Sequence, residues 1–244
     1  MDTSHLYFLV AVVALVAFLY SSVGHAGASG YIATMTLFGV ATAAIKPTAL
    51  VLNILVAVIG SYQFWRAGFF SWKLFWPFAL LSVPMAYVGG YLHVPVHIFK
   101  ILVGIVLWLS AARFFYRQGD PSEANLPSKP IALGMGAGIG FLSGLTGTGG
   151  GIFLTPLLLF CRWARTRNVA AVSALFILVN SIAGLAGYFS SGRAIPSMAG
   201  VLAAAVVVGG SLGSYFGSRK FPVRVIQLLL GAVLVIAGAK LIFA

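Results

Sequence analysis

Long apolar runs with almost no charged side chains dominate this sequence. The runs lie near residues 6–23, 29–41, 47–65, 73–92, 96–116, 131–145, 150–161, 169–190, 195–217 and 223–243. A run of about 20 apolar residues can cross the hydrocarbon core of a bilayer as a helix. Only 7% of the 244 residues are charged, whereas a soluble domain carries charge on roughly a quarter of its residues. We therefore predict an all-α polytopic membrane protein.

The two halves of the chain share a pattern. A shift of 127 residues superposes Asn53 on Asn180, Arg66 on Arg193 and Pro95 on Pro222, pairs that seldom arise by chance in an apolar composition. The same shift superposes Gly60 on Gly187, Gly90 on Gly217 and Gly104 on Gly231. We expect an N-terminal transmembrane repeat over residues 1–116, an exposed linker over 117–130 and a C-terminal transmembrane repeat over 131–244. An odd number of crossings per half, about five here, turns the second repeat upside down, as in many secondary transporters.

The basic residues are distributed unevenly among the predicted connections. With the N-terminus outside, one side of the membrane holds Arg66, Lys73, Arg113, Arg117, Lys129, Arg162, Arg165, Arg167, Arg219, Lys220 and Arg224. The other side holds Lys46, Lys100, Arg193 and Lys240. Because cytoplasmic loops collect Lys and Arg, this bias predicts a multi-pass protein of a bacterial cytoplasmic membrane with both termini on the outer side.

Two glycine-rich stretches lie between the first and second segments of each half, over residues 21–30 and 143–151. Glycine releases the backbone from helix and allows it to approach a ligand closely. Each stretch leads into another helix, whose N-terminal N–H groups and positive dipole end suit an anion. Close packing of helices through small residues is the alternative explanation. The short segments after the breaks either cross the membrane or turn back as hairpins.

Buried polar side chains supply further candidates. The asparagines Asn53 and Asn180 either donate to an oxyanion or bridge two helices. The His25 side chain either binds the anion, carries a coupled proton or has a structural role. Weaker candidates on the same segments are Lys46, Thr48, Gln63, Ser173 and Ser181.

The acidic residues Asp2, Asp120 and Glu123 all lie outside the apolar runs. Sodium sites and many proton relays in carriers use a buried carboxylate, so the sequence favours an anionic substrate. We expect no metal site, no cofactor and no enzymatic activity, because neither a metal-binding motif nor a nucleophile–base motif is present. Nucleic-acid binding is not expected either, since no basic helix or aromatic–basic module is found. The expected partners are a small anion and the lipid bilayer.

Residues 21–30, Lys46 to Asn53, Gly144 to Gly151 and Ser173 to Gly184 resemble the sulfite exporter TauE/SafE family. The resemblance covers nearly the whole chain. It implies transport of sulfite or an organosulfonate such as sulfoacetate, at a site where the two glycine-rich stretches meet. Its residues here would be Gly24, His25, Gly27, Thr146, Gly147, Thr148 and Gly149. The first stretch departs from a fully glycine-rich pattern at Ala26, Ala28 and Ser29, of which we retain Ser29 as a candidate.

Taken together, these features predict a secondary transporter that moves a small sulfur-containing oxyanion by alternating access. In this hypothesis Asn53 and Asn180 are supporting donors, and His25 couples a proton to transport. An anion-selective channel is the alternative, because both kinds of protein would select anions. The oligomeric state is not predicted.

Overall fold

A computed structural model describes residues 3–92, 108, 125–193 and 198–243 of the chain, and these residues form helices without any strand. In chain order the helices are α1 (Thr3–Ser22), α2 (Ala28–Leu37), α3 (Thr42–Arg66), α4 (Trp72–Tyr91), α6 (Lys129–Thr146), α7 (Gly151–Phe160), α8 (Thr166–Ser190), α9 (Met198–Tyr215), the π-helical turn η1 (Phe216–Lys220) and α10 (Val223–Phe243). The all-α polytopic fold is thus confirmed.

Helices match nine of the ten predicted apolar runs. The run over residues 96–116 lies outside the described residues except for Trp108, as does the linker before residue 125. Five helices are long and apolar enough to span a membrane, within His5–Ser22, Ala43–Arg66, Trp72–Tyr91, Thr166–Ser190 and Met198–Lys220. Helices α2 and α7 have only 10 residues each. At 1.5 Å per residue they reach about half of a hydrocarbon core of about 30 Å.

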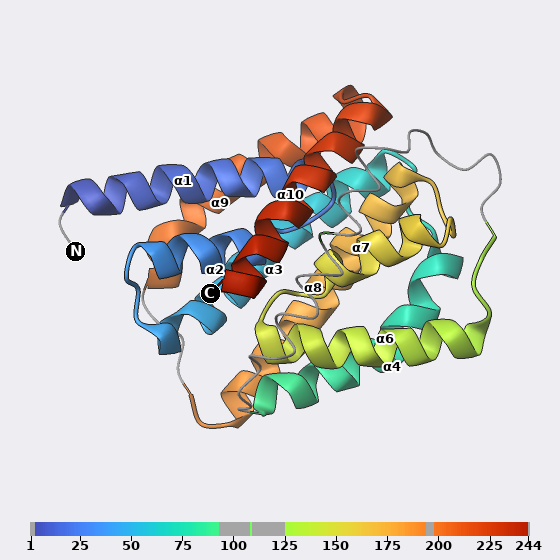
Figure 1. The fold of residues 1–244 in the computed structure, drawn as a ribbon, viewed down its shortest axis with the longest axis horizontal. Coiled ribbons are helices and arrows are strands. Elements are labelled where there is room, and N and C mark those ends of the chain that lie inside the picture. Colours follow the sequence, from blue (N-terminus) through green and yellow to red (C-terminus); the bar gives the residue numbers. More distant parts are fainter. Residues whose placement is uncertain (1–2, 93–107, 109–124, 194–197, 244) are drawn as a thin grey trace.

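Helices of the first half pack mainly on helices of the second half (Figure 1). Helix α1 lies along α9, and α6 lies along α4. Helices α3 and α8 pack on each other in the interior, α3 also contacts α9, and α8 also contacts α4. Exchanging the two halves reproduces this set of contacts, as expected for two related repeats. The inversion of one repeat relative to the other stays a prediction.

Glycines spaced four residues apart allow the closest of these contacts. A Cβ atom on any of them would lie 1.9–2.2 Å from a backbone oxygen of the neighbouring helix. On α6 the glycines are Gly136, Gly140 and Gly144, which lie against Phe78, Ser82 and Ala86 of α4. On α9 and η1 they are Gly209, Gly213 and Gly217, which lie against Ala14, Phe18 and Ser22 of α1. Packing through small residues, the alternative explanation for glycine in this sequence, therefore does operate within the helices.

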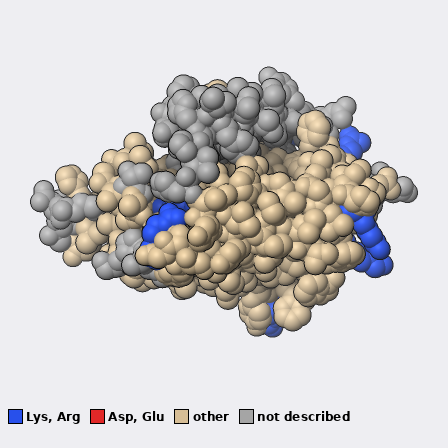
Figure 2. Space-filling view, turned by 90° about the horizontal axis from the view of Figure 1, so that it is seen from below, with Lys and Arg blue, Asp and Glu red and all other residues tan. Residues whose placement is uncertain are grey.

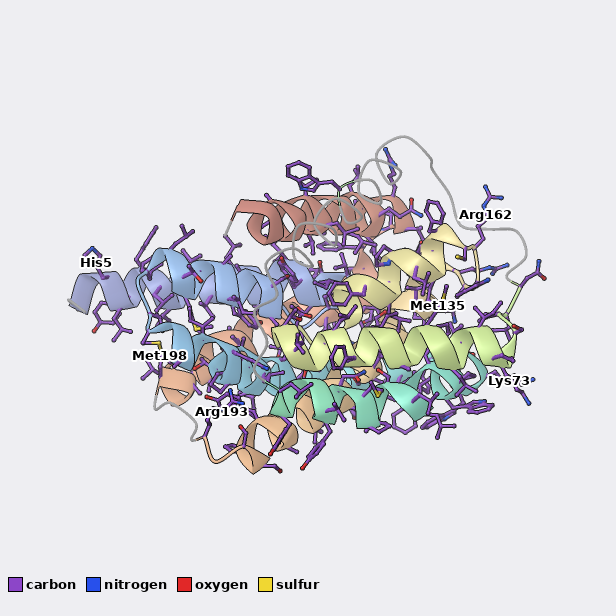
Figure 3. The ribbon with its side chains drawn as sticks, turned by 60° about the horizontal axis from the view of Figure 1, so that its bottom comes forward. His5, Lys73, Met135, Arg162, Arg193 and Met198 are labelled. Atoms are coloured by element: carbon purple, nitrogen blue, oxygen red, sulfur yellow. The ribbon has the colours of Figure 1, made fainter. Side chains whose placement is uncertain are left out.

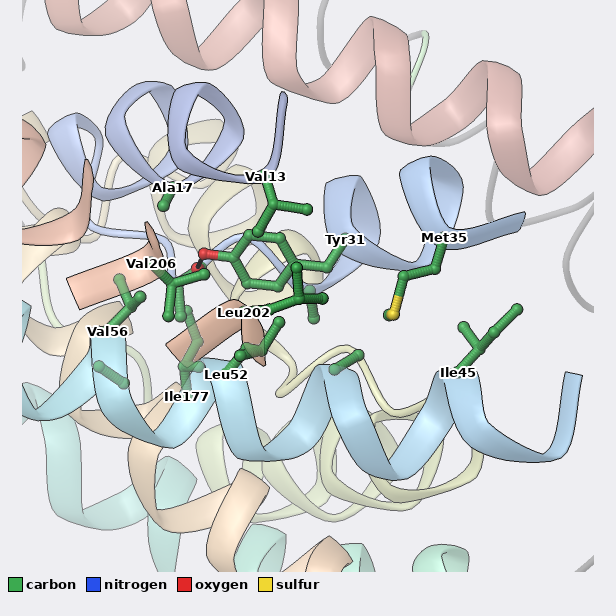
Figure 4. Close-up of a cluster of buried hydrophobic side chains, with 14 of the residues drawn as sticks. Val13, Ala17, Tyr31, Met35, Ile45, Leu52, Val56, Ile177, Leu202 and Val206 are labelled. Atoms are coloured by element: carbon green, nitrogen blue, oxygen red, sulfur yellow. Dashed lines mark hydrogen bonds between the residues drawn. The ribbon is translucent and has the colours of Figure 1, made fainter. Parts of the chain in front are cut away.

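A buried apolar cluster joins α1, α2, α3, α8 and α9 around the first break (Figure 4). Its largest member is Tyr31, whose ring is fully buried and whose hydroxyl donates to the Ala26 carbonyl in the break. Leu52, Val56 and Ile177 close the cluster from α3 and α8. This packing fixes the position of α2, which is too short to be held by its own backbone hydrogen bonds.

Basic side chains separate to two ends of the helices. One end, which we call the basic end, contains the close of α3 and the starts of α4, α6 and α8, as shown by contacts of Asn168 with Phe69 and of Lys129 with Trp76. Lys73 and Arg162 lie at this end, whereas Arg193 and His5 lie toward the opposite end (Figure 3). At the opposite end Arg193 donates to the Tyr91 carbonyl.

The surface between these ends is almost without charge. Figure 2 shows a face that is largely uncharged, with a few Lys and Arg side chains and no acidic side chain among the described residues. Large apolar side chains such as Leu80, Leu212 and Val208 are 50–59% exposed, as expected for a surface in contact with lipid. Helix α1 begins and α10 ends toward the same end of the molecule (Figure 1).

Candidate anion site at the two helix breaks

The first break separates α1 from α2 over residues 23–27. Gly24 and Gly27 adopt positive φ angles of 80° and 105°, and Gly27 is the residue that precedes α2. A side chain at Gly24 would collide with the Ala170 backbone of α8. The break therefore needs glycine both for its conformation and for its close approach to α8.

The second break separates α6 from α7 over residues 147–150. Gly147, Gly149 and Gly150 have φ angles of 75°, 76° and 82°, and Gly150 precedes α7. Both predicted glycine-rich breaks are therefore present between the first and second segments of their halves. In Figure 1, α2 and α7 extend from the middle of the molecule toward opposite ends.

The side chain of Asn53, fully buried on α3, connects the two breaks. Its Oδ1 accepts a hydrogen bond of 3.0 Å from the Ala28 N–H at the start of α2. Its Nδ2 donates to the Thr148 carbonyl at 3.3 Å and to Ser181 Oγ at 3.4 Å. The Gly149 Cα lies so close that a Cβ there would be 2.7 Å from Nδ2. The start of α2 and the predicted residues Thr148 and Gly149 of the second break therefore lie around one amide.

The junction brings the start of α2 and the break that precedes α7 to one amide. First-turn N–H groups have no acceptor within their own helix and carry the positive end of the helix dipole. On α2 the Ala28 N–H is taken by Asn53. Residues 22–30 and 147–152 are all buried. Two positive helix ends in a region without acidic side chains among the described residues form an environment suited to an anion.

His25 lies in the first break beside the start of α7. Its side chain is 3% exposed, and the Gly151 backbone and the Tyr20 ring lie next to the imidazole. Backbone groups of Val23 and Gly151 are close to the ring, but neither ring nitrogen has a hydrogen bond of good geometry within the described part of the chain. A buried imidazole with free polar atoms beside a helix N-terminus is available to a ligand or a proton.

The candidate hydroxyl groups beside the breaks form hydrogen bonds with neighbouring protein groups. Ser29 Oγ donates to the Tyr20 hydroxyl at 3.0 Å. Thr146 Oγ1 donates to the Leu142 carbonyl and lies 2.9 Å from Thr148 Oγ1. Ser29 and Thr146 are thus engaged with neighbouring protein groups in this conformation.

Asn180 is also fully buried, but it makes its hydrogen bonds elsewhere. Its Oδ1 accepts from Ser82 of α4 at 2.7 Å, and its Nδ2 donates to the Phe176 carbonyl of its own helix. Asn53 is the twelfth residue of α3, whereas Asn180 is the fifteenth of α8. The twelfth position of α8 is Ile177, which packs against Gly149 and Gly151. The described contacts of Asn180 therefore do not include the breaks.

Sequence reasoning gave little or no indication of several other polar residues near the junction. Ser181, a weaker sequence candidate, contacts Asn53 and lies beside Gly149. The buried hydroxyls of Thr48 and Ser143 have no hydrogen-bond partner among the described residues. The aliphatic part of Lys46 packs on Gly147. Tyr20 and Tyr31 give no sequence signal, because an aromatic residue in an apolar run is ordinarily read as core.

These features define a multi-pass helical membrane protein with two glycine-rich helix breaks, one in each half of the chain, at a buried junction. A profile of the sulfite exporter TauE/SafE family matches residues 9–241. The chain belongs to this family, and it is accordingly a membrane transporter and not an enzyme.

Similar proteins have names that agree with this class. A "probable membrane transporter protein y4hK" of Sinorhizobium fredii is 40% identical in an alignment of 249 positions that covers both chains completely. The "probable membrane transporter protein YjnA" of Bacillus subtilis is 24% identical over 90% of this chain and 92% of its own. A similar protein of Methanocaldococcus jannaschii is 26% identical over 78% of this chain and 76% of its own. No solved structure gives a significant match.

Proposed function

We propose that this protein is a secondary carrier of a small sulfur-containing oxyanion, sulfite or an organosulfonate such as sulfoacetate. The observation that carries the proposal is the junction at Asn53, where one amide bonds the start of α2 and the break that precedes α7, without any carboxylate among the described residues. A tetrahedral or pyramidal oxyanion would accept hydrogen bonds from first-turn N–H groups of both short helices. The family description supports the sulfur chemistry.

Alternating access is the mechanism we propose. The residues of the junction are buried, which supports an occluded state better than a continuously open pore. Asn53 holds both breaks at once through Ala28 and Thr148. Movement of one half against the other would separate these contacts on one side of the junction while the glycines of the breaks absorb the change in backbone angles.

The orientation we propose places the basic end in the cytoplasm. Both termini would then lie on the outer side of a bacterial cytoplasmic membrane, as the Lys and Arg distribution predicts. Labelling of single cysteines in intact cells tests this. A His5→Cys variant should react with an impermeant maleimide from outside, and a Lys73→Cys variant should react only after the membrane is opened, in a background where Cys161 is replaced by Ser. The reverse pattern would contradict the orientation.

Transport is tested with purified protein in liposomes. We expect saturable uptake of radiolabelled sulfite and acceleration of uptake by unlabelled sulfite inside the vesicles. Such counterflow requires a carrier, whereas unitary conductance steps in a planar bilayer would favour the anion-selective channel instead. Competition for sulfite uptake by sulfoacetate, sulfate or acetate shows whether the site also recognises a sulfonate, a sulfate or a carboxylate. Absence of any sulfite flux with a correctly folded protein would refute the substrate.

Proton coupling through His25 is a separate part of the proposal. If His25 carries the proton, a pH gradient should accelerate wild-type flux and should leave His25→Gln flux unchanged. His5→Gln is the matched control, because His5 is exposed near the start of α1. A pH response that persists in His25→Gln would exclude His25 as the coupling group without affecting the substrate assignment.

A further inference from the structure

A groove opens on the membrane-facing surface at the basic end, between the last turns of α3 and the end of α9. It has a volume of about 390 Å³, and its lining includes Val58, Ile59, Tyr62, Arg66, Tyr215 and Arg219. Gln63 closes its floor by donating to the Ser211 carbonyl of α9 at 3.1 Å. None of the groove's lining residues belongs to either break, so the groove is a separate site from the junction.

Two guanidinium groups face this groove, and each is held by a tyrosine. Arg66 lies 5.7 Å from the centre of the Tyr62 ring and donates to the Tyr62 hydroxyl at 3.2 Å. Arg219 lies 4.9 Å from the centre of the Tyr215 ring and donates to Gln63 Oε1 at 3.5 Å. A guanidinium has five N–H donors, so most donors of both side chains remain for a further acceptor.

The described part of the chain supplies no negative charge to this pair. Among the described residues neither arginine has an acidic neighbour, and the chain's three acidic residues, Asp2, Asp120 and Glu123, all lie outside the described ranges. Arg219 belongs to the π-helical turn η1, in which the Phe221 N–H donates to the Phe216 carbonyl. Turns of this kind often occur at functional sites. The groove therefore has the charge that complements an anionic group.

Apolar surface continues from the arginines toward the middle of the membrane. Val58 is 50% exposed and Tyr62 is 53% exposed on α3, and Val208 and Leu212 are exposed on α9. A soluble anion would use only the guanidinium groups. A phospholipid would use both features, with its phosphate between Arg66 and Arg219 and an acyl chain along the apolar surface. We propose that this groove binds an anionic phospholipid of the leaflet at the basic end.

The test is native mass spectrometry of the full-length protein released from micelles with phosphatidylglycerol or phosphatidylcholine. We expect wild-type protein to retain phosphatidylglycerol in preference to phosphatidylcholine. The double variant Arg66→Gln, Arg219→Gln should lose roughly 30-fold in apparent affinity for phosphatidylglycerol, from about 1 kcal/mol for each basic group. The control Lys73→Gln, Arg162→Gln removes the same charge at the same end, outside the groove lining, and should retain wild-type affinity.

Three outcomes would overturn the proposal: equal retention of both lipids by wild type, equal losses in the groove and control variants, or displacement of the lipid by inorganic phosphate at millimolar concentration. The last result would identify a site for free phosphate. A thermal-unfolding measurement confirms that each variant is folded before its lipid binding is compared. Lipid retention is measured without sulfite, so its result is independent of the transport assay.

Discussion

Asn53 and Asn180 are paired by the repeat in the sequence, yet they make different contacts in the structure. Asn53 joins the start of α2, through Ala28, to the second break, through Thr148. Asn180 joins α8 to α4 through Ser82. The corresponding place on α8, counted from the helix start, is Ile177, and it offers the second break only an apolar surface. The comparison teaches that related halves can share helices and breaks while one half alone supplies the polar connection.

The largest expected effect comes from exchanging each asparagine for leucine. Asn53→Leu leaves the buried Ala28 N–H and Thr148 carbonyl without this partner, which costs about 1–3 kcal/mol and should lower sulfite flux by about 10-fold or more. Asn180→Leu removes an interhelical hydrogen bond worth about 0.6 kcal/mol and should change flux by no more than about threefold. Flux into liposomes is the measurement. Equal losses would show that the two asparagines are equivalent in function.

The two breaks should differ in their response to an added methyl group. At Gly24 the new Cβ would lie 2.4 Å from the Ala170 backbone oxygen, whereas at Gly149 it would lie 2.7 Å from the Asn53 and Ile177 side chains. Both positions have positive φ, which costs alanine about 1–2 kcal/mol. We expect Gly24→Ala to lower the free energy of unfolding more, because a backbone must move, and Gly149→Ala to affect flux more, because Asn53 must move.

Gly138→Ala is the matched control for both breaks. Gly138 lies within α6, and a Cβ there has no neighbouring heavy atom within 4 Å. Replacing a mid-helix glycine by alanine should raise stability by about 0.5–1 kcal/mol and leave flux unchanged. Thermal unfolding in detergent and flux are measured on the same preparations. Similar stability losses at all three positions would show that the strain is not specific to the breaks.

The smallest expected effect concerns two hydroxyls on either side of the first break, Tyr20 of α1 and Ser29 of α2. Ser29→Ala and Tyr20→Phe each remove the hydrogen bond between Ser29 Oγ and the Tyr20 hydroxyl. Each should lower the free energy of unfolding by about 0.5–1.5 kcal/mol, and the double variant should lose less than the sum, because both changes remove one interaction. Additive losses, or a change in substrate affinity for Ser29→Ala alone, would instead indicate that Ser29 contacts the anion.

The positions of the helices and breaks could be predicted well because their causes are local. An apolar run longer than the hydrocarbon core must be helical in a bilayer, where no water satisfies a free backbone group. The first break was recognisable from Gly24 and Gly27, and the second from the run of glycines between α6 and α7. Helix α6 begins at Lys129, two residues before the predicted apolar run, because Pro130 is well suited to the first turn of a helix.

The partners of the buried polar groups were beyond local reasoning. Asn53 and Thr148 are 95 residues apart, and nothing in their sequence neighbourhoods indicates that they meet. Glycine also has two uses that composition cannot distinguish. Gly140 allows α6 to approach α4, and Gly149 allows the chain to turn beside Asn53. Close packing requires that the backbone of a neighbouring helix lies at the glycine, and a turn requires that the glycine adopts a left-handed conformation. Only the packed fold shows which requirement a given glycine meets.

The sequence by itself determined that this protein is a helical membrane protein with two glycine-rich breaks, and the resemblance gave its family. Those features follow from hydropathy, glycine placement and residue identity, each of which acts within a few turns of chain. The tertiary structure alone decided that Asn53 joins the breaks while Asn180 holds α4, and that Arg66 and Arg219 face one groove. Such contacts depend on helix packing. Asn180 lies three residues later in α8 than Asn53 does in α3, which moves its side chain about 4.5 Å along the helix axis and to different neighbours.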